Sequence, residues 1–374
     1  ATGQPLSQKA ISSLFLAGFI SSALVGTAAG SLVDKYGRRA GCLAFAIICA
    51  ASAVSVMASR WSLLAAGRFL GGVATSLFMC APESWLCAEH ARLSLPAAAL
   101  GELFGWAYFA DSIIAILAGQ VASYAAAVGG PTAPFLASLP LLLMGSIIVV
   151  CTWSENRAVI GGGGGGGLRD GLYALMREPT LLALAFLQAL FEASMYIFVL
   201  VWGGAVASAA PTGADVPFGK IFSCLMAACA VGSALFSLLS GLKLRVEAFM
   251  QPVLLGAAIA LYSAAFPPAD VASLVWPLPP AWLYLIFCFI GFEVAVGVYF
   301  PAVGSMRGAY LPDSQRGAIM NITRVPLNVL VIIVALARDE LGDRGALLCA
   351  AAALLLATVA LATIWMRGVK TKLE

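Results

Sequence analysis

The sequence predicts an all-α polytopic membrane protein, and three observations support this fold class. Only 10% of the 374 residues are charged, whereas soluble domains carry about 25% charged residues. Hydrophobic residues make up 61% of the chain, and the mean hydropathy is +0.97. A helix needs about 20 apolar residues to cross a bilayer. Uncharged runs of that length or more recur at residues 10–33, 40–59, 113–154, 221–242, 248–269, 271–292 and 345–366.

The expected transmembrane helices follow from where charges, Pro and Gly divide these runs. The segment GGPTAP at 129–134 predicts a turn inside the longest run, and PPADVASLVWPLPP at 267–280 predicts a loop. Eleven spans result, at 10–33, 40–59, 61–84, 98–127, 132–153, 179–205, 217–241, 248–268, 281–306, 316–337 and 344–367. Their lengths, without alternating ten-residue segments, argue against an outer-membrane barrel.

The chain is expected to fold as two helical bundles joined by a linker. Residues 154–178 contain seven consecutive glycines and a group of charges, which is typical of a flexible connection exposed to water. Residues 1–153 then form an N-terminal transmembrane bundle of five spans, and residues 179–374 form a C-terminal bundle of six.

The distribution of Lys and Arg predicts the orientation, because cytoplasmic loops carry an excess of positive charge. If the loop at 34–39 is cytoplasmic, the same side also holds Arg92, Arg157, Arg169, Arg177, Lys243, Arg245, Arg307, Arg316, Arg367, Lys370 and Lys372. The opposite side holds Lys9, Arg60, Lys220, Arg338 and Arg344. The C-terminus and the linker are therefore expected to be cytoplasmic.

Composition argues against most other classes of function. His90 is the single histidine, which removes most metal sites and His-based catalytic designs. The nine Cys show no CxxC spacing and indicate buried thiols. The glycine run has no following Lys-Ser/Thr pair, so it is no Walker-type nucleotide site. We therefore expect no metal, no cofactor, no nucleic-acid partner and no enzymatic activity.

A dense group of charges lies in GSLVDKYGRRAG, residues 30–41, between two uncharged runs. It resembles the signature loop of the major facilitator superfamily, with matches at Gly30, Leu32, Asp34, Lys35, Gly37, Arg38 and Arg39. Gly37 permits a tight turn, and Asp34 can pair with the basic residues or lie at a helix N-terminus. A gating latch between the bundles is expected, formed by Asp34, Lys35, Gly37, Arg38, Arg39 and Glu83; a solvated loop is the alternative.

Further segments resemble the eukaryotic molybdate-anion transporter family of that superfamily, in order along nearly the whole chain. They are LAAGRFLGGVATS, PESWLCAEH, LQALFEASMYIFVLVW, PFGKIFSCLMAACAVGSALF, FEVAVGVYFPAVGSMR and NITRVPLN. The resemblance implies a secondary transporter in the lipid bilayer that moves molybdate or a related oxyanion by alternating access. It also implies twelve helices with the signature loop after the second. The loop here follows the first span, so the first helix of twelve is expected to be missing.

Two arginines inside the expected spans are candidate substrate ligands, because ionisable residues within a membrane are costly and by default mark function. Asn321, Arg324 and Asn328 share one helical face, and a guanidinium presents a fork of donors to an oxyanion. We expect this face and Arg68 to bind the substrate. A buried ion pair is the alternative for Arg324, and a structural or gating role is the alternative for Arg68.

Three acids are candidates for coupling transport to protons or for ion pairing. Glu192 and Glu293 lie midway along the spans 179–205 and 281–306, and Asp111 lies on the span 98–127. A buried carboxyl can serve as a proton carrier because desolvation favours its protonated form. The alternative is that each acid neutralises an arginine. Small-xxx-small spacings such as Gly101/Gly105 and Gly304/Gly308 predict close helix packing.

Two other functions compete with oxyanion transport. One is a carrier of a sugar or another organic solute, which the arginines in the spans argue against because such a substrate is neutral. The other is a membrane sensor or scaffold that does not transport. The plasma membrane is the expected location, because no retention signal is evident.

Overall fold

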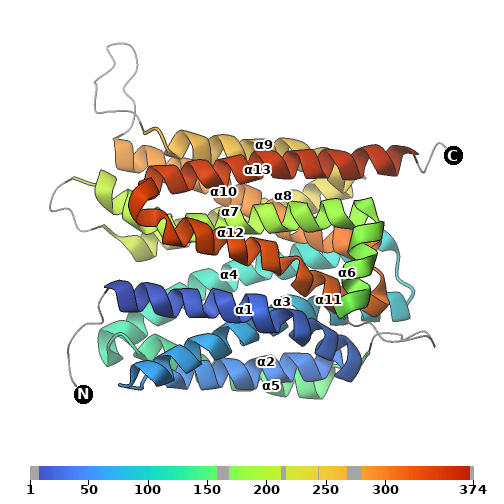
Figure 1. The fold of residues 1–374 in the computed structure, drawn as a ribbon, viewed down its shortest axis with the longest axis horizontal. Coiled ribbons are helices and arrows are strands. Elements are labelled where there is room, and N and C mark those ends of the chain that lie inside the picture. The colour runs from blue at the N-terminus through green and yellow to red at the C-terminus, as the bar shows by residue number, and fades with distance from the viewer. Residues whose placement is uncertain (1–7, 158–167, 212–215, 243, 268–279, 371–374) are drawn as a thin grey trace, which may run out of the picture. The chain divides into compact units, whose positions relative to one another are not determined.

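The computed structural model describes residues 8–157, 168–211, 216–242, 244–267 and 280–370, and these form helices joined by short turns (Figure 1). The elements are α1 (Gln8–Tyr36), α2 (Arg38–Ser55), α3 (Trp61–Arg92), α4 (Ala97–Gly129), α5 (Ala133–Thr152), α6 (Leu168–Arg177), α7 (Pro179–Ala209), α8 (Phe218–Gly241), α9 (Val246–Ala264), α10 (Ala281–Tyr310), the 3₁₀ helix η1 (Asp313–Gln315), α11 (Arg316–Ile322), α12 (Arg324–Leu336) and α13 (Arg338–Lys370).

The predicted spans coincide with these helices. Ten helical stretches within the described residues are long and apolar enough to cross a membrane. They are α2, α3, α4, α5, α7, α8, α9, α10, the stretch Ala318–Leu336 and α13. The first predicted span lies within α1. The span predicted at 316–337 is divided into α11 and α12 by a turn at Thr323.

One helix was not predicted. Within 154–178 the sequence suggested only a flexible linker, but residues 168–177 form α6. The seven glycines at 161–167 and most of the loop predicted at 267–280 lie outside the described residues.

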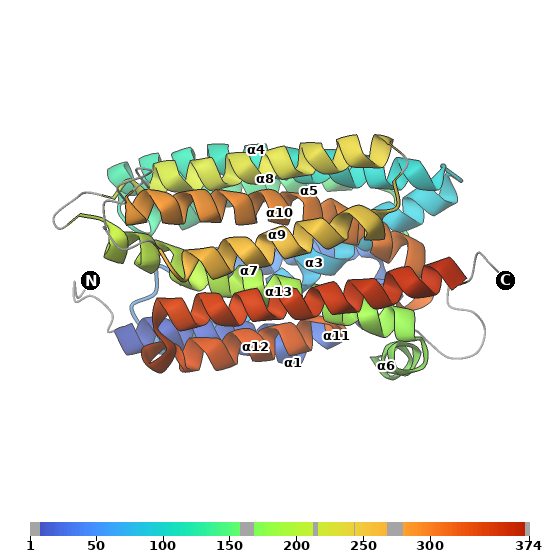
Figure 2. The ribbon, with the colours of Figure 1, turned by 90° about the horizontal axis from the view of Figure 1, so that it is seen from above.

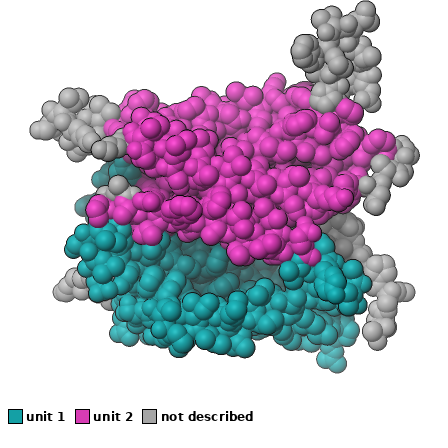
Figure 3. Space-filling view, turned by 180° about the vertical axis from the view of Figure 1, so that it is seen from behind, with its two compact units in different colours: residues 1–95, 121–181, 310–329 teal, residues 96–120, 182–309, 330–374 magenta. Residues whose placement is uncertain are grey.

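The chain divides into two compact units, coloured teal and magenta in Figure 3. Unit 1 comprises residues 1–95, 121–181 and 310–329, and unit 2 comprises residues 96–120, 182–309 and 330–374. Each unit draws on segments from both sides of 154–178. The units are therefore a different division from the two predicted bundles, which remain a prediction.

Unit 1 is built around α3, which packs against α1 and α2. The α1–α3 crossing is close because Gly72 has no side chain; a Cβ there would collide with the carbonyl oxygen of Gly18 and the hydroxyl of Ser21. Ser22 and Ser76 form a hydrogen bond of 3.0 Å in the same interface. Small residues and hydroxyls thus bring these helices together, as is common in membrane interiors.

Unit 2 has an aromatic core between α7 and α10. The rings of Phe191 and Tyr299 stack with centroids 3.7 Å apart, and Phe198 packs against Phe289 and Phe292. The predicted close packing at Gly304 is confirmed, because a Cβ there would lie 3.1 Å from the ring of Phe104.

All nine cysteines are free, but the prediction that they are buried is correct only for Cys42, Cys80 and Cys87, because Cys49, Cys229, Cys288 and Cys349 are partly exposed. Cys151 and Cys224 are exposed. Both lie on helices that cross the membrane, where an apolar environment can be lipid as well as protein interior.

Candidate functional site

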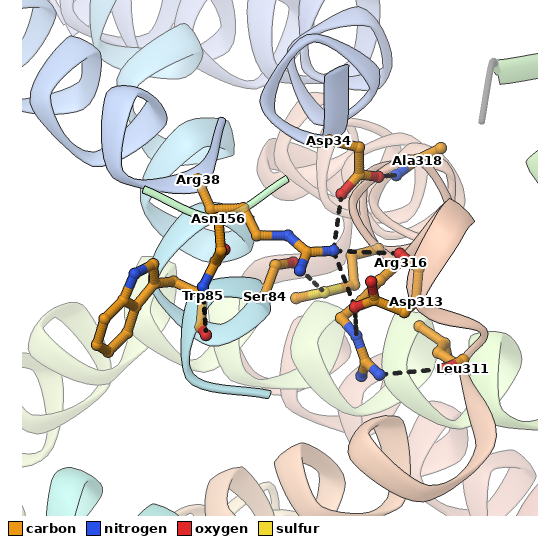
Figure 4. A network of polar contacts seen from close by, with 10 residues as sticks. Asp34, Arg38, Ser84, Trp85, Asn156, Leu311, Asp313, Arg316 and Ala318 are labelled. Carbon is orange, nitrogen blue, oxygen red and sulfur yellow. Dashed lines mark hydrogen bonds and ion pairs between the residues drawn. The ribbon is translucent and has the colours of Figure 1, made fainter. Parts of the chain in front are cut away.

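The charges of residues 30–41 meet the start of α11 in a polar cluster (Figure 4), in which Asp34, Arg38 and Arg316 are buried and Asp313 is partly exposed. This cluster, hereafter the Asp34 cluster, consists of Asp34, Arg38, Asp313 and Arg316. Asp34 lies in the last turns of α1, and Arg38 opens α2. Gly37 joins the two helices with φ of 128°, a conformation that a residue with a side chain rarely adopts. The sharp turn therefore places Asp34 and Arg38 side by side.

Arg38 is the centre of the cluster. It is completely buried, and its Nη2 donates hydrogen bonds to Asp34 Oδ1 at 3.4 Å, Asp313 Oδ1 at 3.0 Å and the Asp313 carbonyl at 3.1 Å. Two carboxylates thus compensate one buried guanidinium, which would be costly alone. The Nε of Arg316 lies 4.0 Å from Asp313 Oδ1, and its Nη2 donates to the Leu311 carbonyl at 3.1 Å.

Asp34 also binds α11 directly. Its Oδ2 accepts the backbone N–H of Ala318 at 3.3 Å, one of the first-turn donors that have no partner within their own helix. The two roles suggested for Asp34 by the sequence, pairing with a basic residue and lying at a helix N-terminus, are therefore both present.

A second acid fixes the start of α2. Glu155 accepts the backbone N–H of Arg39 and that of Ala40, each at 3.0 Å, and the Arg38 N–H donates to the Asn156 carbonyl at 3.0 Å. A Cβ on Gly37 would collide with the Glu155 carboxylate. The first turn of α2 is thus capped by the segment that follows α5.

Aromatic contacts hold that segment in place. Trp153 stacks on Trp85 with ring centroids 3.9 Å apart, and the Trp85 indole N–H donates to the Ser154 carbonyl at 2.8 Å. The Asn156 amide donates to the Trp85 carbonyl at 3.2 Å. The end of α5 is therefore tied to both α2 and α3.

The structure shows where the predicted latch residues lie. Asp34 and Arg38 meet in the Asp34 cluster, whereas the Arg39 guanidinium donates to the Val150 carbonyl at 2.7 Å. Lys35 is exposed, 5.3 Å from the centroid of the Tyr36 ring. Glu83 is buried on α3.

Sequence reasoning missed four contributors: Asp313, Arg316, Glu155 and Asn156. Asp313 and Arg316 could have been noticed as an acid and a base three residues apart just before an apolar span. Glu155 and Asn156 could have been noticed as polar residues directly after an apolar span. Neither pattern says which helix start it will contact, because those contacts span more than 100 residues of sequence.

A second polar group lies where α11 gives way to α12, again within unit 1. Asn321, Arg324 and Asn328 are 1%, 3% and 1% exposed, so the predicted polar face is buried as a whole. Asn321 and the buried Cys80 of α3 share a side-chain hydrogen bond. Both amide atoms of Asn328 lack a hydrogen-bond partner among the described residues. An unsatisfied buried amide is costly.

Arg68 does not share that burial. It is half-buried on α3, and its guanidinium lies 5.8 Å from the centroid of the Phe135 ring on α5. This contact is a cation–π geometry. Its predicted role as a substrate ligand remains a prediction.

The three candidate acids belong to unit 2 and have different surroundings. Glu192 is buried on α7 and accepts the Tyr299 hydroxyl at 3.5 Å. Glu293 is buried on α10, and within the described part of the chain no hydrogen bond or ion pair reaches its carboxyl. Asp111 is exposed on α4. Of the three, Glu293 is thus the buried acid whose carboxyl has no partner among the described residues.

The fold is that of known membrane carriers. The chain superimposes on the Escherichia coli fucose:proton symporter with a TM-score of 0.69 and 14% identity, covering 95% of this chain and 90% of that one. For a bacterial homologue of the iron transporter ferroportin, outward-facing, the TM-score is 0.74 at 14% identity, with 97% and 92% covered. With its helices long and apolar enough to cross a membrane, the protein therefore has the fold of these multi-pass membrane carriers.

Sequence comparisons define the family. Residues 3–291 match a family described as sugar transporters with twelve transmembrane helices. The chain is 31% identical to the molybdate-anion transporter of Xenopus tropicalis over 333 residues, which are 86% of this chain and 69% of that protein. It is 30% identical to that of Danio rerio over 369 residues, 90% and 73% of the two chains. The chain belongs to the molybdate-anion transporter family of the major facilitator superfamily, as its sequence segments suggested.

Proposed function

We propose that this protein is a secondary active transporter that moves molybdate, or a related oxyanion such as sulfate, by alternating access. The relatives named as molybdate-anion transporters support the substrate class. The observation on which the site rests is the buried stretch Asn321–Asn328, with a guanidinium between two carboxamides.

This stretch has the chemistry that an oxyanion requires. The Arg324 guanidinium stays charged in any surroundings and presents several N–H donors in one plane. The side-chain N–H groups of Asn321 and Asn328 add neutral donors, and those of Asn328 have no partner among the described residues. A tetrahedral dianion entering this site could accept hydrogen bonds from a buried guanidinium and from the Asn328 amide, whose atoms have no partner among the described residues.

The Asp34 cluster supports the alternating-access part of the proposal. It ties residues 34–38 to residues 313–318, which lie on opposite sides of the glycine-rich linker. In a two-bundle carrier, a contact between such segments forms in one access state and breaks in the other. The cluster is thus a gating latch made of Asp34, Arg38, Asp313 and the start of α11.

The remaining parts of the proposal concern coupling and location. Glu293 and Glu192 are the groups we assign to proton coupling, because both are buried acids on helices that cross the membrane. The excess of Lys and Arg on the side of the 34–39 loop supports a cytoplasmic location of that loop and of the C-terminus. The plasma membrane is the proposed location.

The test is molybdate binding and uptake by Arg324 variants in reconstituted vesicles, normalised to folded protein. Arg324→Lys keeps the charge but loses the planar fork, so affinity should fall. Arg324→Ala should weaken binding further, by about 1.5–3 kcal/mol for a lost charged hydrogen bond, or about 10- to 150-fold. Arg60→Ala is the control, because Arg60 is exposed and lies outside the site.

Double variants separate ligand binding from ion pairing. If Arg324 only neutralises an acid such as Glu192, Arg324→Ala should fold poorly, and adding Glu192→Gln should restore both folding and normal molybdate affinity. That recovery would contradict the assignment of Arg324 to the substrate. Molybdate binding without uptake by the wild-type protein would instead indicate a sensor.

A carrier of a neutral sugar is the second candidate, because the matching family is described as sugar transporters. Competition between solutes for uptake distinguishes an oxyanion carrier from a sugar carrier. Uptake of labelled molybdate that is blocked by sulfate and unaffected by hexoses supports the oxyanion site. Hexose uptake that is insensitive to Arg324→Ala would support the sugar carrier.

A further inference from the structure

Helix α6 lies crosswise to the helices of its own unit. In Figure 1 it runs across the direction of α1, α2 and α5, and in Figure 2 it is seen nearly end-on. Because α2, α3 and α5 are long and apolar enough to cross a membrane, a helix that runs across them is expected to lie along the membrane plane. It packs beside α11 and α1, within unit 1.

One face of α6 is fitted to α11. A Cβ on Gly171 would lie 3.3 Å from both Ala318 Cβ and Ile322 Cδ1, so this glycine lets the two helices approach closely. Leu175, one turn later, is buried. α6 therefore rests on the helix whose first turn bonds to Asp34.

The opposite face is apolar and exposed. Leu172, Tyr173 and Met176 are 50%, 56% and 70% exposed, and their spacing of i, i+1 and i+4 places them in one stripe along the helix. Three side chains are far too few for a stable protein interface, which takes about 20–30 residues on each side. A lipid surface needs no such area, because a short amphipathic helix can enter it alone.

The charges around the stripe fit lipid headgroups. Arg169 and Arg177 are exposed at the two ends of the helix, and the Arg177 guanidinium lies 4.4 Å from the Tyr173 ring centroid. Asp170 is half-buried, and Glu178 follows the helix as an exposed acid. Basic side chains beside an aromatic and apolar stripe can extend to lipid phosphates while their stems stay in the apolar layer.

We propose that α6 is an interfacial helix. Its stripe of Leu172, Tyr173 and Met176 enters the lipid headgroup layer, and Arg169 and Arg177 bind phosphates of anionic lipids. Through Gly171 and Leu175 it holds α11, and with it the Asp34 cluster, at a fixed depth in the membrane. The inference concerns a surface separate from the proposed substrate site and is tested without transport.

The test measures the depth of a nitroxide label on α6. Cys151 and Cys224, the two exposed cysteines, are replaced by Ser, and Leu172→Cys or Met176→Cys is labelled in the full chain. Glu178→Cys serves as the matched control, because it is exposed just beyond the same helix. The proteins are reconstituted in phosphatidylcholine alone or mixed with phosphatidylglycerol. Collision rates with oxygen, which partitions into lipid, and with a water-soluble nickel chelate report the depth.

Labels at 172 and 176 should collide with oxygen and be shielded from the nickel chelate, whereas a label at 178 should meet the chelate. Phosphatidylglycerol should bury the label at 176 more deeply, and Arg169→Gln with Arg177→Gln should abolish that difference. Labels at 172 and 176 that meet the chelate as readily as 178 would overturn the interfacial assignment. If the depth of the label at 176 changes neither with phosphatidylglycerol nor with the two Arg→Gln substitutions, the proposed binding of anionic lipid is wrong.

Discussion

At the scale of single residues, Asp34 has two partners from different parts of the chain, the Arg38 guanidinium and the Ala318 N–H. Asp34→Asn keeps the shape but removes the charge, and Arg38 retains Asp313. The access state in which the Asp34 cluster is formed should be destabilised by about 1–3 kcal/mol, the cost of an impaired buried hydrogen bond. We expect slower molybdate transport with nearly unchanged binding and expression, measured as uptake rate and equilibrium affinity.

Lys35→Gln is the matched control for this prediction. Lys35 stands next to Asp34 in the sequence but is exposed and outside the cluster, so its loss should leave the transport rate close to that of the wild type. Parallel loss of binding and transport in Asp34→Asn would contradict the gating role and place Asp34 in the substrate site.

The residues that sequence reasoning found are those whose chemistry is unusual for their surroundings. An arginine or a glutamate in an apolar span is conspicuous, and Arg324, Glu192 and Glu293 proved to be buried. Asp313 and Glu155 were not conspicuous, because charges at the ends of spans are ordinary. Only the packing of distant segments shows that these two acids contact the start of α2.

At the scale of helices, the backbones of α8 and α10 approach each other closely at Gly297, so this crossing tests how far the packing depends on a glycine. A Cβ on Gly297 would collide with the carbonyl oxygen of Cys229, and Ser233 donates to the Gly297 carbonyl at 3.0 Å. Gly297→Ala should force the helices apart and destabilise the protein by about 1–3 kcal/mol, as overpacking usually does. The measurement is the thermal unfolding midpoint in detergent.

Gly291→Ala on the same helix provides the comparison. A Cβ there would lie 3.9 Å from Ala260, an ordinary contact, so this change should be neutral or stabilising by up to about 1 kcal/mol through helix propensity. Equal unfolding midpoints for the two alanine variants would show that the α8–α10 crossing tolerates a methyl group.

Helices that cross a membrane were predictable because their length and apolarity are set by the bilayer. The eleven predicted ranges all fall on helices. α6 was missed because it is short, carries charged residues at both ends and follows a glycine run, which together look like a linker. The break at Thr323 between α11 and α12 was not predicted, although Asn321, Arg324 and Pro326 interrupt the apolar pattern around it.

At the scale of the whole molecule, the proposed ligands and the proposed proton carriers belong to different compact units. Arg324 and its two asparagines lie in unit 1, and Glu192 and Glu293 lie in unit 2. A carrier coupled to protons needs the loading of one group to bias the access state seen by the other. The coupling acids can therefore be tested by a change that leaves the substrate site untouched.

Glu293→Gln is that change. The glutamine is nearly isosteric and cannot exchange a proton, and no described residue pairs with Glu293, so no ion pair is broken. We expect accumulation of molybdate driven by a pH gradient to be abolished, while exchange of labelled for unlabelled molybdate continues.

Glu192→Gln keeps an oxygen to accept the Tyr299 hydroxyl and should show the same uncoupling if Glu192 carries the proton. Glu340→Gln, exposed at the start of α13, should behave as the wild type. Unchanged pH dependence in both buried variants would remove these two acids from proton coupling. Loss of exchange together with accumulation would instead assign them to the binding of the substrate or to the fold.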